Sequence, residues 1–557
     1  MDSSTAAVAV LRALLRGGVH DLVLAPGSRS APLAIAAYAA DAAGDLRLHV
    51  RVDERSAGFL ALGLSMGSRR PVAVVTTSGT AVGNLLPAVM EAAHAGRGLL
   101  VVSADRPASL RGTGANQTTW QEGIFGRFAP CHDLDVAATE DEIRTAVATL
   151  CARPGPGHLN LQLREPLLPP ARPWWPGNGY GEAPAHGTRP GTEAPEVRHP
   201  RPTAPGAAGA AVVSLEPGPR TVVVAGDDAG KAGRLLAEAG GYPLLAEPTS
   251  GSRAGDHAIR TYRLLLQTPL AEAIERVVVL GHPTLSRPVT ALLSRPDVEV
   301  SSVVGRSGIA TDPARQAHTF TAPPVVAAPG DPAWLARWRE ADARLSADVD
   351  RFVDALPELD ALHVAAEVGA ALGPGETLVV GSSNPVRDLD LMLAPYPPRQ
   401  RRMVVGNRGL AGIDGLVSTA LGVALGREGG GRTLALLGDL TFLHDANGLV
   451  LGADEPRPDV TLVVVNDDGG SIFALLEQGA GEYAAAFERV FATPHGVDLA
   501  ARCAATGTAY RLARTRAELR DALAEPSSGV RVLEAQVSRE NRRATAEALT
   551  ALVGARS

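Results

Sequence analysis

The fold is decided by residues 433–473, TLALLGDLTFLHDANGLVLGADEPRPDVTLVVVNDDGGSIF. The run TLALLG at 433–438 is apolar and is followed by Asp, and the run VTLVVVN at 460–466 is rich in β-branched side chains. Runs this short and apolar are typical of parallel strands that are buried on both faces of a sheet. The residues between them are enough for one helix, expected at about 442–451, and a polar return. The stretch therefore predicts a right-handed strand–helix–strand crossover.

Two acidic side chains follow the ends of these two strands. Asp439 comes directly after the first strand and Asp467 after the second, with Gly469 and Gly470 next to it. Ligands of open α/β sheets bind at the edge where such strands end, so we expect the two carboxylates to lie close together. With the carbonyls of the Gly-Gly turn they offer the oxygen ligands that Mg²⁺ prefers, and glycine lets the backbone approach a diphosphate closely. Taken alone, each aspartate is better explained as a helix N-cap, and it is the pairing of the two that favours a ligand site.

The composition is that of an ordinary α/β protein. The chain has 557 residues, of which 45% are hydrophobic and 20% charged, and its formal charge is −7, so we expect more than one domain and no nucleic-acid partner. Cys131, Cys151 and Cys503 are odd in number and widely spaced, which predicts reduced thiols. We found no basic-then-apolar leader and no apolar run of membrane-spanning length, and therefore expect no membrane insertion and a cytoplasmic location.

A strand–turn–helix pattern recurs along the whole chain and predicts parallel sheets with helices on both faces. The fold class expected is α/β, with three doubly wound domains. The segment around 155–170, GPGHLNLQLREPLLPP, is expected to be the edge strand that closes the first of them. The expected boundaries are a first domain at 1–175, a linker at 176–210, a central domain at 211–330, a linker and connecting helix at 331–355, and a third domain at 356–557.

The crossover also carries a known motif. Gly-Asp at 438–439 followed by Asn-Asp-Asp-Gly at 466–469 resembles the metal–diphosphate motif of thiamine-diphosphate enzymes, which starts Gly-Asp-Gly and ends Asn-Asn. This chain departs from the motif at Leu440, which replaces a glycine, and at Asp467, which replaces the metal-binding Asn. The resemblance implies thiamine diphosphate with Mg²⁺ or Mn²⁺. It also implies a cofactor held between the pyrimidine-binding first domain of one subunit and the diphosphate-binding third domain of another, so that a homodimer is the smallest active unit and a homotetramer is expected.

Glu54 follows the strand pattern RLHVRVD and precedes a helix of small residues. The resemblance implies that Glu54 holds the protonated N1′ of the aminopyrimidine, a contact that lets the cofactor's 4′ nitrogen remove the thiazolium C2 proton. Without the resemblance, Glu54 would be explained as an acidic first-turn residue that complements the helix dipole.

Further strings narrow the resemblance to one family, the 2-succinyl-5-enolpyruvyl-6-hydroxy-3-cyclohexene-1-carboxylate synthases of menaquinone biosynthesis. These strings are PGSRS at 26–30, SADRP at 103–107, GANQ at 114–117, NRG at 407–409 with GIDG at 412–415, and GGSIF at 469–473. The family implies decarboxylation of 2-oxoglutarate and addition of the resulting succinyl-semialdehyde carbanion to isochorismate.

Each of these substrates carries two carboxylates, so the pocket must be cationic although the chain is acidic, and arginine forks suit carboxylates. By position, Ser28 and Gln117 are candidates for hydrogen bonds to reacting oxygens or to a proton-relay water. The residues that the resemblance assigns to substrate are Arg29, Arg106, Asn116, Arg287, Ser383, Arg387 and Arg408. Any one loop arginine, taken alone, would be explained as a surface ion pair.

The resemblance also implies an apolar lining around the cofactor. Ile413 would be the wedge beneath the thiazolium, and an apolar wall favours CO₂ loss because the reacting carboxylate loses its charge. The residues assigned to the cofactor besides Glu54 and Asp439 are Ser383, Gly412, Ile413, Leu440, Gly470, Ile472, Phe473 and Leu476. The apolar ones among them are explained equally well as core residues.

Two other functions stay open on the sequence. One is a different carboligase or 2-oxoacid decarboxylase, such as a relative of acetolactate synthase, which should turn over pyruvate in place of 2-oxoglutarate. The other is a non-catalytic cofactor-binding or regulatory subunit, against which the set Glu54, Asp439 and Asp467 argues.

Overall fold

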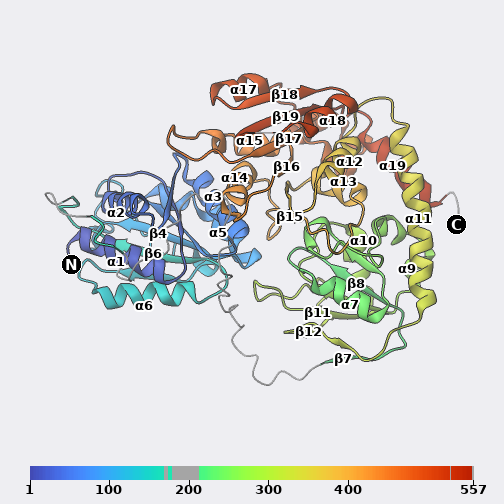
Figure 1. Ribbon diagram of the computed structural model, residues 1–557, viewed down its shortest axis with the longest axis horizontal. Coiled ribbons are helices and arrows are strands. Elements are labelled where there is room, and N and C mark those ends of the chain that lie inside the picture. The colour runs from blue at the N-terminus through green and yellow to red at the C-terminus, as the bar shows by residue number, and fades with distance from the viewer. Residues whose placement is uncertain (169–173, 178–212, 527, 555–557) are drawn as a thin grey trace. The chain divides into compact units, whose positions relative to one another are not determined.

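The computed structural model describes residues 1–168, 174–177, 213–526 and 528–554 (Figure 1). The linker expected at 176–210 lies almost entirely outside the described residues. The chain forms two compact units, Met1–Ala211 with Val450–Pro456, and Val212–Leu449 with Arg457–Ser557.

The first unit is built on a six-stranded sheet of order β2-β1-β3-β4-β6-β5, in which all pairs are parallel. The segment predicted as its edge strand is instead internal, because β6 pairs with β4 on one side and with β5 on the other. The edge is β5, CHDL, whose half-buried mixed pattern carries no strong strand signal. The strands are β1 (Asp21–Leu24), β2 (Arg47–Val50), β3 (Val72–Thr76), β4 (Leu99–Asp105), β5 (Cys131–Leu134) and β6 (Gly157–Gln162).

Helices cover both faces of this sheet. One face carries α1 (Ser3–Arg16), α2 (Ala31–Ala42) and α6 (Glu140–Cys151), whose apolar residues join the strands in one core. The helices α3 (Glu54–Ser68) and α5 (Leu86–Ala95) pack on one another, and α3 also packs on β1 and β3. The small residues of α3 allow this close packing: a Cβ on Gly58 would lie 2.9 Å from that of Ala88.

The second unit contains two large parallel sheets. The central sheet has the order β12-β11-β10-β8-β9, and the C-terminal sheet has the order β15-β14-β16-β17-β19-β18, which repeats the order of the first unit. The central strands are β8 (Thr221–Ala225), β9 (Leu244–Ala246), β10 (Arg276–Leu280), β11 (Glu299–Val303) and β12 (His318–Phe320), with a separate pair β7 (Ser214–Leu215) and β13 (Val325–Val326). The C-terminal strands are β14 (Thr377–Val380), β15 (Met403–Val405), β16 (Thr433–Gly438), β17 (Val460–Asn466), β18 (Ala509–Ala513) and β19 (Val530–Gln536).

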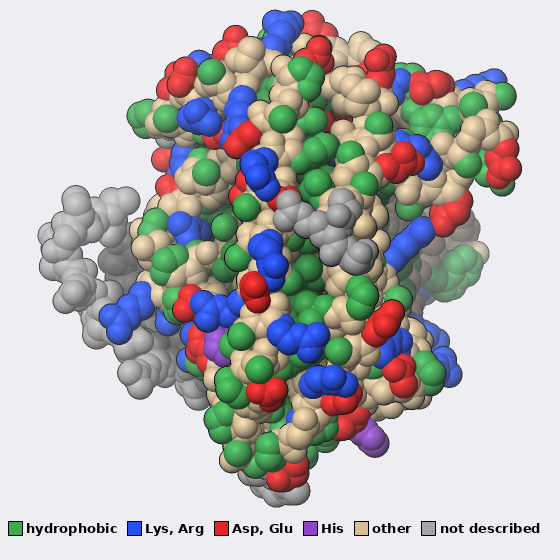
Figure 2. All heavy atoms as spheres, turned by 90° about the vertical axis from the view of Figure 1, so that its right-hand side faces the viewer, with side chains coloured by type: hydrophobic (Ala, Val, Ile, Leu, Met, Phe, Trp, Pro, Cys, Tyr) green, Lys and Arg blue, Asp and Glu red, His purple; other side chains and the backbone are tan. Residues whose placement is uncertain are grey.

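A long helix and a buried arginine hold these two sheets in one unit. Helix α11 (Pro332–Asp354) begins after the N-cap Asp331, buries Trp338 completely, and runs beside α19 (Arg542–Gly554) (Figure 1). The guanidinium of Arg253, which follows β9, donates to the carbonyls of Ala246 (2.5 Å) and Leu393 (3.0 Å). The face that carries α11 and α19 mixes basic, acidic and hydrophobic side chains without a large patch of one charge (Figure 2).

The crossover at 433–473 forms as predicted, except that its helix is shorter. Helix α15 (Asp439–His444) ends early and a 3₁₀ turn, Ala446–Leu449, follows it. The shorter helix has a packing reason: a Cβ on Gly448 would lie 2.6 Å from the Ser418 hydroxyl, and Asp445 accepts the Ser418 N–H (2.7 Å). No described helix is both long and apolar enough to cross a bilayer.

Candidate functional site

The first candidate centre is the pair Asp439 and Asp467 in the second unit. Strands β16 and β17 are neighbours, with Gly438 opposite Val465, so both carboxylates leave the sheet at the same edge. Asp439 is 2% exposed and accepts the Gly469 N–H (2.9 Å). Burial, and then the charge of Asp439, raise the pKa of Asp467 to about 7, and burial raises the pKa of Asp439 as well. The two carboxylates therefore repel one another where no cation neutralises them.

His495, which sequence reasoning missed, also contacts this pair. Its Nδ1 accepts the Val497 N–H (2.9 Å), so the proton of the neutral ring lies on Nε2, which donates to Asp439 Oδ2 (3.3 Å). The histidine comes from the loop after residues 488–492, and no local pattern in the sequence connects it with Asp439. Only the folded chain brings the two together.

The turn at 467–470 is fixed by the chain itself. A Cβ on Gly469 would lie 2.2 Å from the Ala492 carbonyl oxygen, and the Gly470 N–H donates to the same oxygen (2.6 Å). Ala492 thus approaches both glycines closely, and the approach of a diphosphate to them stays a prediction. Asp468 adopts the left-handed region at φ 54° and accepts the His495 N–H (3.0 Å). The turn is thus ordered by protein contacts.

The donors at this edge fit a magnesium ion. Among the described residues, no three His, Cys, Asp or Glu side chains come together as a metal site. The protein's own ligands would therefore be the two carboxylates and a carbonyl such as that of Gly469, which suits Mg²⁺ because this ion keeps water and phosphate oxygens in its shell. A cavity of about 1060 Å³, lined by Asp467, Ser471 and His495 among others, opens beside them.

The second centre is a group of arginines in the same unit. Arg387, in α13 (Asn384–Met392), donates to the Ser383 carbonyl (2.7 Å). Arg408, after β15, is 3% exposed and donates to the hydroxyls of Thr284 (2.7 Å) and Ser382 (3.2 Å). Neither guanidinium forms an ion pair with a carboxylate in the described part of the chain. Burial, and then the charges of Arg408 and Arg263, lower the pKa of Arg387. These two arginines are therefore not explained as surface ion pairs.

Ser383, four residues before Arg387 in sequence, has an unusual backbone. It is the N-cap of α13 with φ 73° and ψ −137°, a conformation that costs a non-glycine residue free energy and that recurs at functional sites. Gln117, in the first unit, and Ala411, in the loop before Gly412, also have positive φ. Three of the loops that sequence analysis assigned to ligands thus contain strained residues.

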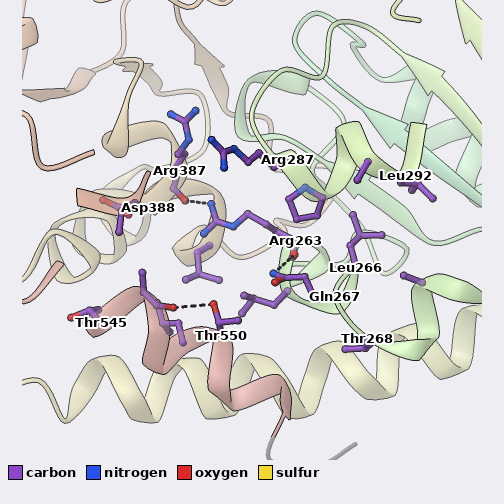
Figure 3. A pocket seen from close by; sticks show the side chains of 18 of the residues that line it. Arg263, Leu266, Gln267, Thr268, Arg287, Leu292, Arg387, Asp388, Thr545 and Thr550 are labelled. Carbon is purple, nitrogen blue, oxygen red and sulfur yellow. Dashed lines mark hydrogen bonds between the residues drawn. The ribbon is translucent and has the colours of Figure 1, made fainter. Parts of the chain in front are cut away.

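Arg287 and Arg387 line a common cavity of about 890 Å³, together with Arg263 (Figure 3). Arg287 is exposed and its guanidinium is ion-paired with the equally exposed Glu477 (2.8 Å). Arg287 is therefore explained by a surface ion pair, as expected for a loop arginine taken alone, although it lines the same cavity as Arg387. Apolar side chains, including Leu266 and Leu292, line another part of the cavity (Figure 3).

The side chains predicted to surround the cofactor are half-buried. Ile472 and Phe473 lie in the 3₁₀ helix Ser471–Leu475, and the Phe473 ring packs 5.7 Å from that of Phe491. These residues are partly exposed, unlike the fully buried core residues, and are therefore accessible to a ligand. The other half-buried members of the set are Gly412, Ile413, Leu440 and Leu476. Gly470, also assigned to the cofactor, is buried.

In the first unit, the ends of β1, β3 and β4 carry a polar cluster. Arg106 donates to the Ser78 hydroxyl (2.5 Å) and to the Gln117 carbonyl (2.7 Å). Burial, and then the charge of Arg29, lower the pKa of Arg106. The Gln117 amide donates to the Ser78 carbonyl (2.7 Å). Ser78 was missed by sequence reasoning and connects two predicted residues.

The remaining predicted residues of this unit follow β1 (Ser28 and Arg29), β2 (Glu54) and β4 (Asn116). Ser28 and Asn116 are exposed, and Arg29 is ion-paired with the exposed Glu165 at 3.7 Å. Glu54 is the first residue of α3, is half-buried, and accepts a hydrogen bond from the Asn84 amide (3.2 Å). The Glu54 carboxylate is thus accessible at a strand end, as the sequence predicted.

Comparison with known proteins places the chain among thiamine-diphosphate enzymes. Residues 4–124 match the family model described as "Thiamine pyrophosphate enzyme, N-terminal TPP binding domain". Curated proteins named 2-succinyl-5-enolpyruvyl-6-hydroxy-3-cyclohexene-1-carboxylate synthase match nearly end to end. The protein of Nocardioides sp. is 55% identical over 99% of this chain and 98% of its own length. That of Kineococcus radiotolerans is 49% identical over 100% of both, and that of Rhodococcus erythropolis 44% identical over 98% of both.

The fold has a solved counterpart. The crystal structure of benzoylformate decarboxylase from Polynucleobacter necessarius superposes with a TM-score of 0.64 and covers 96% of this chain and 99% of that one. The two sequences are 17% identical, so this likeness concerns the fold alone.

Proposed function

The chain belongs to the family of 2-succinyl-5-enolpyruvyl-6-hydroxy-3-cyclohexene-1-carboxylate synthases, and we propose that it decarboxylates 2-oxoglutarate and joins the remaining succinyl-semialdehyde unit to isochorismate. It is a thiamine-diphosphate-dependent transferase of menaquinone biosynthesis. The products of the proposed reaction are 2-succinyl-5-enolpyruvyl-6-hydroxy-3-cyclohexene-1-carboxylate and CO₂.

The observation that carries the choice of substrate is the arginine pair without counter-charge. Arg387 and Arg408 have no ion pair with a carboxylate among the described residues, and burial, followed by repulsion from Arg408 and Arg263, lowers the pKa of Arg387. A substrate carboxylate would remove this repulsion, and the planar guanidinium can bind it through two hydrogen bonds. The hydroxyl of Ser383, near Arg387, would donate a further hydrogen bond to this carboxylate. Arg287 would bind it from the rim of the cavity that Arg287 shares with Arg387.

The cofactor would be held between two subunits, by the acidic pair of one and by Glu54 of the other. Asp439, Asp467 and the Gly469 carbonyl would bind Mg²⁺ or Mn²⁺ together with the diphosphate, because a divalent ion offsets the repulsion between the two carboxylates. Glu54 would hold a proton at N1′ of the pyrimidine. When bound, thiamine diphosphate supplies the carbanion chemistry of the reaction.

The other residues would orient the substrates and exclude water. Arg29 and Arg106, which carry like charges close together, would receive the carboxylates of isochorismate, with Asn116 beside them. Ser28 and Gln117 would donate to reacting oxygens or hold the water that relays a proton. The half-buried apolar set of Ile413, Ile472, Phe473 and Leu476, with Leu440 and the backbone of Gly412 and Gly470, would form a dry wall around the reacting carbons.

We further propose a homodimer as the smallest active unit, a homotetramer as the full assembly, and a cytoplasmic location. The dimer follows from family membership, since enzymes of this superfamily share the cofactor between subunits.

Purified protein with thiamine diphosphate, Mg²⁺, 2-oxoglutarate and isochorismate tests the function. We expect isochorismate to be consumed with release of one CO₂ per product. A different carboligase would instead keep its turnover when pyruvate replaces 2-oxoglutarate, and Arg408→Ala would then have little effect. Unchanged isochorismate in the presence of an active control enzyme would refute the proposal.

A further inference from the structure

Glu247 is a buried carboxyl group next to the proposed substrate arginines. It directly follows β9 in the central sheet and is 2% exposed. Its Oε1 accepts two backbone N–H groups, those of Thr284 (2.9 Å) and Leu285 (2.8 Å), from the turn between β10 and α10 (Arg287–Leu293). Glu247 thus fixes the turn that presents the Thr284 side chain.

That turn reaches the C-terminal sheet through one hydroxyl group. Thr284 Oγ1 accepts a hydrogen bond from Arg408 at 2.7 Å. Since β9 and β10 both pair with β8 in parallel, their carboxyl ends lie at one edge of the central sheet, and Glu247 can hold the turn without a further element. The chain of contacts therefore runs from Glu247 through Thr284 to Arg408.

The protonation state of Glu247 determines whether it neutralises Arg408. Burial raises the pKa of Glu247 to about 8, although the charge of Arg408 works in the opposite direction. Near neutral pH the carboxyl is therefore largely protonated. A neutral carboxyl still accepts the two N–H groups, but it does not cancel the positive charge of Arg408. An incoming carboxylate can therefore pair with Arg408 without competition from Glu247.

We propose that Glu247 is a positioning residue that acts through the 284–285 turn and the Thr284 hydroxyl to orient Arg408 toward the carboxylate of 2-oxoglutarate. The inference rests on the proposed function, because it assigns Arg408 to that substrate. It predicts an effect on the binding of one substrate, whereas a residue that only stabilises the fold would affect both substrates and the melting temperature together.

Two pairs of variants test the inference in the full-length enzyme with thiamine diphosphate and Mg²⁺. Thr284→Val removes the hydroxyl at constant shape, and Thr284→Ser keeps it. Glu247→Met removes the acceptor at similar volume, and Glu247→Gln keeps an oxygen that can accept both N–H groups. Thr290→Val is a matched control, because the Thr290 hydroxyl bonds only weakly within α10, at 3.4 Å from the Ser286 carbonyl.

We expect Thr284→Val and Glu247→Met to raise KM for 2-oxoglutarate roughly fivefold or more, as the loss of a hydrogen bond to a charged group predicts. We expect kcat, and KM for isochorismate, to change less than about twofold. Thr284→Ser, Glu247→Gln and Thr290→Val should keep KM for 2-oxoglutarate within about twofold of the parent enzyme.

Three results would overturn the inference. The first is an unchanged KM for 2-oxoglutarate in Thr284→Val, which is decisive even where Glu247→Met does not fold. The second is a rise in KM for 2-oxoglutarate in Glu247→Gln as large as in Glu247→Met. That result would show that the charge of the Glu247 carboxylate, and not its hydrogen bonds, causes the effect. The third is a parallel loss for both substrates with a lowered Tm. An inactive parent enzyme would refute the proposed function instead, so the two failures are distinguishable.

Discussion

Among single residues, Arg387 differs from the other arginines of its cavity in forming no ion pair within the described part of the chain. Arg542 lines the same cavity but forms an ion pair with the buried Asp388. A protein that keeps a charge without a partner does so at a cost in stability, which is common where function requires it. The contrast between these two arginines separates a binding role from a structural one.

Arg387→Met should change the free energy of unfolding by less than about 1 kcal/mol, because the relieved repulsion offsets the lost bond to Ser383. The same variant should raise KM for 2-oxoglutarate by roughly tenfold or more, because a charge-assisted contact is lost. Arg542→Met should instead destabilise the protein by about 3 kcal/mol, since it leaves Asp388 buried and unpaired. Denaturation midpoints and steady-state kinetics check both. Equal destabilisation by the two variants would contradict this difference.

Glu247 should make stability depend on pH. Its pKa rises from the ordinary value of 4.5 to about 8 on folding, so the unfolded chain loses this proton first as pH rises. Between these values the folded state binds more protons, and stability falls with increasing pH. Glu247→Gln lacks this titration. Its stability relative to the parent should therefore increase by on the order of 3 kcal/mol between pH 5 and pH 8, measured by denaturation at several pH values. A constant difference across that range would contradict the shift.

Among the elements, the loop between β4 and β5 is anchored by one buried amide. Gln121 is fully buried, accepts the Gly79 N–H (2.9 Å), and donates to Asn160 (2.9 Å). This anchor ties the loop that carries Asn116 and Gln117 to the end of β3. The loop is thus positioned by a side chain that has no predicted contact with substrate.

Gln121→Leu should destabilise the first unit by about 2 kcal/mol, because it leaves buried polar groups without partners. We expect faster hydrogen exchange in residues 116–124 and a lower affinity for isochorismate. Thr118→Val, in the same loop, is the control, since the Thr118 hydroxyl bonds only to the Asn116 carbonyl at 3.3 Å. Unchanged exchange rates in Gln121→Leu would show that the contacts between Gln117 and Ser78 hold the loop without Gln121.

For the whole molecule, the proposed active site draws on two units, with Glu54 in one and Asp439 in the other. Residues from separate units can be supplied by separate subunits. If subunits share the site, inactive Glu54→Gln and Asp439→Asn proteins should complement one another when they are dissociated and reassembled together. Each mixed dimer then contains one intact site.

Statistical mixing predicts recovery of about a quarter of the parent activity, since half of the dimers are mixed and each has one functional site of two. Asp439→Asn mixed with Asp467→Ala is the control, because both changes remove ligands from the same half of the site and no intact site can form. No recovery in the first mixture, with exchange of subunits demonstrated, would contradict the shared site.

The local sequence pattern was sufficient to predict those elements that are determined by residues close together in the chain. Short apolar runs that are each followed by Asp identified β16 and β17, and parallel pairing then required Asp439 and Asp467 to share an edge. The same reasoning located Glu54 at the start of a helix. These conclusions depend on side-chain periodicity and strand direction, which a sequence carries in itself.

Contacts between distant segments were decided only by the tertiary structure. Strand order made β6 internal and left the weakly patterned β5 at the edge, and the approach of Ser418 to Gly448 shortened the helix after Asp439. His495 meets Asp439 through a loop whose path no local pattern indicates. The missing counter-charge of Arg387 depends equally on which side chains surround it. Such contacts arise from packing among segments far apart in the chain, so their physical cause is absent from any single stretch of sequence.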